Sequence, residues 1–336
     1  MTAPAHPPKG GQGGLGGWHP PRRGVTRGSP PGGNTVPDAE FSSYYGRPVI
    51  KEPVWKAPDV AGYLFFGGLA GASSVLAAGA QQSGHRELAR VAKLTALGAI
   101  SLSAAALVHD LGRPARFGHM LRVFKPSSPM SIGSWLLAGY GPVAGAAAVS
   151  EMTGILPAAG TAATLGAGLL GPAVATYTAA LICDTAVPAW HAGYREMPYV
   201  FAGSAASAAG GLGLLATPPG AAEPARKLAV LGAAVELVAK RRLIKRLTAT
   251  PGQSLAEPYE TGTTGQALRL AEALTAGGLA GALLGRNSRL VSALSGASLL
   301  AASALTRFGI FEAGMASARD PKYTILPQRQ TAARAE

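Results

Sequence analysis

Side chains that can donate, accept or transfer protons lie inside or at the ends of the apolar runs of this chain. Five of them could act on a bound molecule, namely Tyr63, His109, Asp110, Tyr177 and Asp184. Histidine titrates near neutral pH, a desolvated carboxyl keeps its proton to higher pH, and a phenol donates a hydrogen bond. Around an apolar slot these groups could support proton-coupled chemistry on a small molecule.

Three more charged side chains fall within apolar runs of the second half: Glu236, Glu272 and Arg307. A charge within a bilayer is costly, so such residues usually face a bundle interior, a cavity or each other. We name the three as candidates for proton transfer, and for the two glutamates structural pairing with the nearby basic cluster is the favoured alternative. The side chains of the first group also have structural alternatives. Tyr63 could be an aromatic anchor at the membrane interface. His109 could cap its helix while Asp110 pairs with Arg113, and Asp184 could pair with Arg307 or His191.

A basic connection joins two of the apolar runs, and residues 109–135 of it read HDLGRPARFGHMLRVFKPSSPMSIGSW. Its prolines divide it into short pieces, because each fixes its own φ and biases the preceding residue away from the helical region. The segment is too polar to span a bilayer. Arg113, Arg116 and Arg122 are our candidates for attracting an acidic partner at the loop 109–129, and contact with lipid phosphates is the alternative.

The composition is that of a membrane protein. Of the 336 residues, 48% are hydrophobic and 14% are charged, whereas soluble domains carry about a quarter charged residues. The charges are bunched, which leaves apolar runs near the roughly 20 residues that a membrane helix needs. We predict an all-α polytopic membrane helix bundle of eight transmembrane helices, at 59–80, 88–108, 130–150, 161–187, 198–216, 228–238, 267–284 and 290–311. The sixth is the least certain because it continues into a basic stretch, and without it seven remain.

Lysine and arginine indicate the orientation, since short cytoplasmic loops carry the excess of both. With eight spans, 23 of the 30 basic residues fall on one side and 7 on the other. Both termini and the loop 109–129 are therefore expected on the cytoplasmic side of a bacterial inner membrane. The candidate residues then share one leaflet, which predicts one polar pocket. Tyr177 would form its floor, roughly 21 Å deeper than His191 along a continuous helix.

Three segments are expected along the chain. Residues 1–40 are a Pro/Gly-rich basic tail that should be disordered, 41–317 form the transmembrane domain, and 318–336 are a polar C-terminal tail. The single cysteine, Cys183, excludes an iron–sulfur cluster or a cysteine zinc site made by this chain alone. We expect no catalytic residue, no metal site and no nucleic-acid partner.

Four motifs resemble one family of membrane proteins. The run HDLGRPARF, followed by MLRVFKPSSPMSIGSW, closely resembles the loop after the second membrane helix in the polysulfide reductase/NrfD family. YLFFGGLAGASS at 63–74, TYTAALICDTAVPAWH at 176–191 and AEPYETGTTGQALRLAEALT at 256–275 are similar to the same family and occur in the right order. Together they cover most of the chain from about residue 55 onward.

The resemblance implies a function. Such subunits are quinol-binding membrane anchors without a redox cofactor of their own. They exchange electrons with a 4Fe–4S ferredoxin-like subunit and a molybdopterin-containing catalytic subunit. Menaquinone or ubiquinone is then an exchangeable substrate, bound near the start of the first helix. Tyr63 would stand where a relative has a quinone-binding histidine, and Tyr177 would match a quinone-facing tyrosine. The change from histidine to tyrosine alters the proton donor.

Other membrane functions compete with this interpretation. A di-haem anchor would need histidine pairs facing each other across helices, and His109 with His191 supplies at most one pair. A solute transporter would suit Gly-rich helices, but the sequence has no inverted repeat or paired broken helices. A proton-translocating subunit is the more serious alternative, although the outer half of the bundle offers no continuous acidic path. Protons for quinone turnover are expected from the cytoplasmic side.

Overall fold

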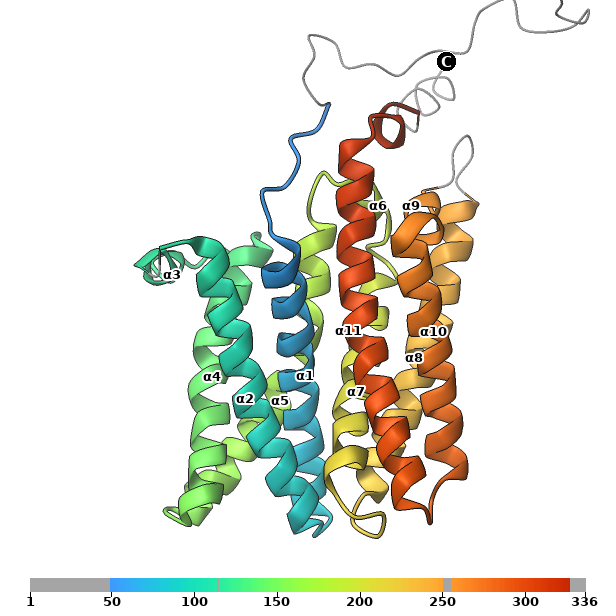
Figure 1. Ribbon diagram of the computed structural model, residues 1–336. Helices are drawn as coiled ribbons and strands as arrows, with labels where there is room; N and C mark the ends of the chain where they lie inside the picture. The colour runs from blue at the N-terminus through green and yellow to red at the C-terminus, as the bar shows by residue number, and fades with distance from the viewer. Residues whose placement is uncertain (1–48, 114, 250–254, 327–336) are drawn as a thin grey trace, which may run out of the picture. The chain divides into compact units, whose positions relative to one another are not determined.

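A computed structural model describes residues 49–113, 115–249 and 255–326, and Figure 1 shows an upright bundle of helices. The predicted N-terminal tail 1–40, the first eight residues of the predicted membrane domain and residues 327–336 of the predicted C-terminal tail lie outside these residues. Eight long helices form the bundle: α1 (Ala57–Gln82), α2 (Arg86–Leu111), α4 (Pro129–Thr153), α5 (Pro157–Cys183), α7 (Met197–Ala216), α8 (Glu223–Thr248), α10 (Gly262–Leu284) and α11 (Arg289–Arg319). Three short helices lie near one end of the bundle in Figure 1, namely α3 (Ala115–Met120), α6 (Pro188–Ala192) and α9 (Glu257–Glu260).

The predicted fold class is confirmed. Within the described residues, seven helices are long and apolar enough to cross a membrane. The eighth long helix, α8, corresponds to the uncertain sixth span. Its 26 residues would extend about 39 Å at 1.5 Å per residue, which exceeds a bilayer core of roughly 30 Å. It is not among the seven because its second half contains the basic run KRRLIKR, which makes the helix too polar.

Glycines allow the long helices to touch through their backbones. A Cβ atom on Gly71 of α1 would overlap the Gly171 carbonyl oxygen of α5, and one on Gly203 of α7 would lie 2.5 Å from the Glu236 amide nitrogen of α8. Gly211 of α7 meets α11 in the same way. Lipid provides no hydrophobic force between helices, so close contact through small residues supplies much of the packing energy.

Hydroxyl groups add specific ties between these helices. The Tyr140 hydroxyl of α4 donates to the Ala70 carbonyl oxygen at 2.7 Å and lies 2.7 Å from the Ser74 hydroxyl of α1. Outside the long helices, the Tyr259 hydroxyl of α9 donates to the Ala189 carbonyl oxygen of α6 at 2.9 Å, and burial raises the pKa of Tyr259. This hydrogen bond ties α9 to α6.

Two predicted boundaries are wrong. The fourth expected span ran to Val187, but α5 ends at Cys183, and Val187 is extended before α6 begins at Pro188. A proline disfavours the helical conformation of the residue before it, which separates the two helices. The last helix, α11, runs eight residues past Phe311 to Arg319 and so enters the predicted polar tail. It is held there because Gly314 lies against the Trp190 ring and the Ser317 hydroxyl accepts a hydrogen bond from the Ala189 amide.

Replacement of Gly71 tests the backbone contact between α1 and α5. Gly71→Ala should destabilise the protein by about 1–3 kcal/mol, because overpacking at a close contact forces the helices apart. Thermal unfolding in detergent measures this change. Gly79→Ala is the matched control on α1, since nothing lies within 4 Å of its added methyl group. Equal melting temperatures for the two variants would contradict the contact.

Candidate functional site

Four helices converge around a cavity near the end of the bundle that carries α3. The cavity measures about 200 Å³ and is lined by Tyr63 of α1, Asp110 of α2, Ser134 of α4 and Tyr177 of α5. Apolar side chains form most of the rest of its wall, including Val60, Leu107, Leu137 and Ile182. We call it the Tyr63–Tyr177 cavity. Three of the five predicted site residues therefore meet in one place.

The two tyrosines face each other edge to face. Their ring centroids lie 6.3 Å apart with an interplanar angle of 76°. Tyr63 is buried, and the Ser103 hydroxyl of α2 donates to its backbone carbonyl oxygen at 3.2 Å. The Tyr177 hydroxyl is buried and has no hydrogen-bond partner among the described residues. A buried polar group without a partner is costly, so this hydroxyl is suited to a ligand that supplies an acceptor.

A glycine of α4 makes room for the Tyr177 ring. A Cβ atom on Gly133 would lie 2.5 Å from the Tyr177 Cε2 atom, closer than any side chain tolerates. Gly133 is not among the predicted site residues, although it belongs to the run MSIGSW that the family resemblance covers. The family motif contains this glycine and could have pointed to it. Only the packing shows that the position must be a glycine to make room for the Tyr177 ring.

Residues at the start of the basic loop line the cavity near the end of α2. Asp110 is half-buried, and Arg116 of α3 donates to the Leu111 carbonyl oxygen at 2.9 Å. Both line the cavity. Arg113 and Arg122 are exposed and do not line it. Among the described residues neither arginine forms an ion pair, and Asp110 is not paired with Arg113.

His109 does not line this cavity. Its side chain is 70% exposed, and its Nδ1 atom lies 2.9 Å from an Asp59 carboxylate oxygen. This contact joins the end of α2 to the start of α1. The expected place of His109 in the pocket is therefore wrong, because the side chain leaves the helix on the solvent side.

Asp184 lies in a second, more open cavity of about 510 Å³, together with His191 and Tyr194. His191 hydrogen-bonds the Cys183 carbonyl oxygen through Nδ1 at 3.0 Å, so neither expected partner, Arg307 or His191, pairs with Asp184. Tyr177 lines this cavity as well as the first. The predicted depth of 21 Å between Tyr177 and His191 is wrong, because α5 ends at Cys183 and the chain turns into α6.

Glu236 and Arg307 form a separate buried cluster between α7, α8 and α11. Glu236 accepts hydrogen bonds from Ser207 at 3.3 Å and Thr306 at 2.9 Å. The Arg307 guanidinium donates to the Phe201 carbonyl oxygen at 2.7 Å and lies 3.7 Å from the centre of the Phe201 ring. Its Nε and Nη1 atoms have no hydrogen-bond partner in the described chain.

The remaining proton-transfer candidate, Glu272, lies at a surface groove between α8 and α10, where a carboxylate oxygen is 3.7 Å from Arg241 Nε. This contact agrees with the favoured alternative of pairing with the basic cluster.

The prediction of a single polar pocket is wrong, because the predicted residues lie at several sites that differ in burial. In the part of the chain that the structure describes, no three His, Cys, Asp or Glu side chains could hold a metal ion together.

Comparison with known proteins identifies one family. The family described as polysulphide reductase, NrfD, matches residues 49–218, which is half of the chain. The matched segment contains every helix that lines the Tyr63–Tyr177 cavity. None of the curated proteins compared with the chain matches it.

A double-mutant cycle tests whether Gly133 serves the Tyr177 ring. Gly133→Ala should cost about 1–3 kcal/mol of stability because the methyl group displaces that ring. In a Tyr177→Leu background the same change should cost much less, and unfolding in detergent measures both. Gly139→Ala, which has free space around it on α4, is the control. Equal costs in both backgrounds would show that Gly133 is required for another reason.

Proposed function

The chain belongs to the polysulphide reductase NrfD family, and from this premise we propose that it is the quinone-reactive membrane anchor of an oxidoreductase complex. It would exchange electrons between the quinone pool and an iron–sulfur partner. The observation that carries the proposal is the buried, unpartnered hydroxyl of Tyr177 at an apolar cavity near Tyr63 and Asp110.

The size and lining of the cavity suit a quinone head group. Pockets for drug-sized ligands measure about 300–1,000 Å³, so a cavity of about 200 Å³ accommodates a substituted ring but not an isoprenoid tail. The tail would pass between helices into the lipid. One carbonyl oxygen of the ring would accept a hydrogen bond from Tyr177, and the Tyr63 ring would form a wall beside it.

The chemistry needs a route for protons as well as electrons. Oxidation of a quinol releases two electrons and two protons, and reduction of a quinone takes up the same. The electrons would pass to or from the cluster of the partner subunit. The protons would pass between the quinone oxygens and water through Asp110, which stands at the end of α2 and reaches the cavity. Acid–base exchange of this kind requires contact within hydrogen-bond reach.

The loop 109–129 is the proposed docking surface for the partner subunits. Arg113 and Arg122 are exposed beside the cavity and attract acidic surfaces. We propose a 4Fe–4S ferredoxin-like subunit here, with a molybdopterin-containing catalytic subunit beyond it. Arg116 would contribute both to docking and to the cavity. The distribution of lysine and arginine supports a cytoplasmic docking face and cytoplasmic termini, in a bacterial inner membrane.

The Glu236–Arg307 cluster supports a second candidate function. A carboxylate and a guanidinium, both fully buried and hydrogen-bonded to hydroxyl and carbonyl groups, are expensive to keep in a membrane protein. Such clusters mark proton pathways in many membrane proteins. A proton-translocating subunit is therefore the alternative, and its quinone chemistry would be secondary or absent.

Removal of one hydroxyl group tests the quinone site. Tyr177→Phe should weaken quinol-analogue binding about 3- to 10-fold, because one hydrogen bond contributes about 0.5–1.5 kcal/mol. Titration of the detergent-purified chain with a fluorescent quinol analogue measures this affinity. Tyr199→Phe is the control, since its ring does not line the cavity. Unchanged affinity in Tyr177→Phe would remove the proposed role of the hydroxyl. A chain that binds no analogue yet moves protons in proteoliposomes would favour the alternative.

Charge reversal tests the docking surface. Arg113→Glu with Arg122→Glu should reduce the iron that copurifies from native membranes about fivefold or more, because like charges repel an acidic partner. Quinol-analogue binding by the isolated chain should not change, since neither residue lines the cavity. Arg286→Glu, an exposed residue in the connection between α10 and α11, is the control. Arg116→Glu should reduce both assembly and analogue binding. Full assembly of both loop variants, the double variant and Arg116→Glu, would refute docking at this loop.

A further inference from the structure

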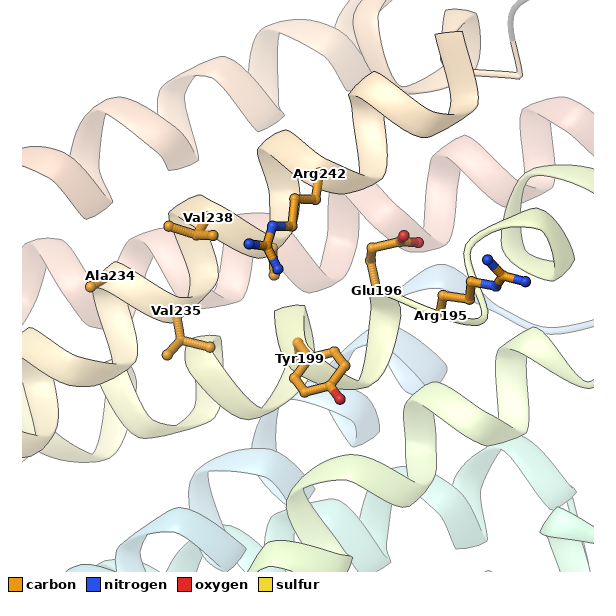
Figure 2. Close-up of a pocket in the computed structure, with 8 residues that line it drawn as sticks. Arg195, Glu196, Tyr199, Ala234, Val235, Val238 and Arg242 are labelled. Carbon is orange, nitrogen blue, oxygen red and sulfur yellow. The ribbon is translucent and has the colours of Figure 1, made fainter. Parts of the chain in front are cut away.

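A groove of about 460 Å³ lies between α7 and α8, lined by residues that do not line the Tyr63–Tyr177 cavity (Figure 2). Its floor is apolar and includes Ala234, Val235 and Val238 of α8. Val238 is 50% exposed, and Leu231, two turns along the same helix, is 63% exposed. Exposed aliphatic side chains on a helix that packs among membrane spans face lipid. The groove therefore opens toward the bilayer.

One end of the groove is cationic. Arg195 and Arg242 are both exposed and line the groove, and Figure 2 shows them on either side of Glu196. Neither forms an ion pair within the described residues. Arg195 Nε donates to the Tyr194 hydroxyl at 2.9 Å, which holds the side chain while leaving its terminal nitrogens available.

The acid at this end does not cancel these charges. Glu196 also lines the groove, but Arg246 of α8 donates to both of its carboxylate oxygens, with Nε distances of 2.8 and 2.9 Å. The Glu196 charge is thereby compensated by a residue outside the lining. The groove thus combines two exposed guanidinium groups, neither of which forms an ion pair among the described residues, with an aliphatic floor.

The spacing along α8 matches the layers of a lipid. Arg246 binds Glu196, the residue before α7 begins at Met197, and Arg242 lies one turn before Arg246 along α8. Val238 and Val235 follow about 6 and 10 Å deeper, at 1.5 Å per residue. Tyr199, 65% exposed, stands beside them as aromatic residues do at membrane interfaces. The order of arginine and valines along α8 therefore matches the order of head group and acyl chain in a lipid.

We propose that the groove binds an anionic phospholipid, with its phosphate at Arg242, the rest of its head group toward Arg195 and one acyl chain lying along Val235 and Val238. Basic pockets between membrane helices recognise anionic head groups in this way. The aliphatic floor selects a lipid over free phosphate, which would gain nothing from it. An anionic lipid is preferred over a zwitterionic one because no carboxylate is left to attract an amine. The inference needs membrane insertion but not the quinone chemistry.

Native mass spectrometry of the full chain in detergent tests this site, with phosphatidylglycerol and phosphatidylcholine of the same acyl chains as probes. The wild-type chain should retain phosphatidylglycerol in preference. Arg195→Gln with Arg242→Gln should weaken that binding about 25-fold, since each basic group contributes about fivefold. Lys227→Gln with Arg286→Gln, two exposed residues that contact Glu223, removes the same charge elsewhere and should leave binding unchanged.

A second variant separates the acyl-chain contact from the charges. Val238→Trp fills the groove while both arginines remain, and it should also reduce phosphatidylglycerol retention. A photoactivatable phosphatidylglycerol should crosslink to peptides containing residues 231–242 in the wild type. Equal retention of the two lipids by the wild type would overturn the proposal. So would an equal loss in the arginine variant and its control, or crosslinking confined to other helices.

Discussion

Backbone contact at one pair of glycines fixes the geometry on which the candidate site depends. Gly71 of α1 lies against Gly171 of α5, with no side chain between the two helices. Tyr63 precedes Gly71 by about two turns, and Tyr177 follows Gly171 by less than two. The crossing of α1 and α5 therefore determines how closely the two rings approach. A wider crossing would separate the rings and leave a gap that lipid or water fills.

The same constraint extends beyond these two helices. The first helix packs against α2, α5, α7 and α11, so it stands at the centre of the bundle. Gly68, three residues before Gly71, faces Ala205 of α7 and the Arg307 guanidinium of α11. The apolar cavity and the charged cluster thus lie on different faces of one small-residue helix. The cavity belongs to the segment that matches the family, whereas Glu236 and Arg307 lie beyond residue 218.

Much of this arrangement follows from the sequence. Apolar runs of bilayer length predict the long helices, and their topology predicts that Tyr63 and Asp110 lie at one end of the bundle. The sequence does not determine how each helix is rotated, so it does not reveal that His109 is exposed beside Asp59 and away from the cavity. It does not reveal the break after Cys183, since the apolar pattern continues to Val187. A glycine gives no sign of the ring that packs on it, so the role of Gly133 does not follow from the sequence.

Tyr177 has a position that affects how a ligand would arrive. Its side chain lines both the enclosed cavity of about 200 Å³ and the open one of about 510 Å³, so a single aromatic ring forms part of the partition between them. A change of its χ1 rotamer would join the two spaces without moving any helix. The ring is packed against Gly133 and Tyr63, so those two neighbours determine how readily it can turn. Exchange of a head group would then be gated by one side chain within a rigid frame.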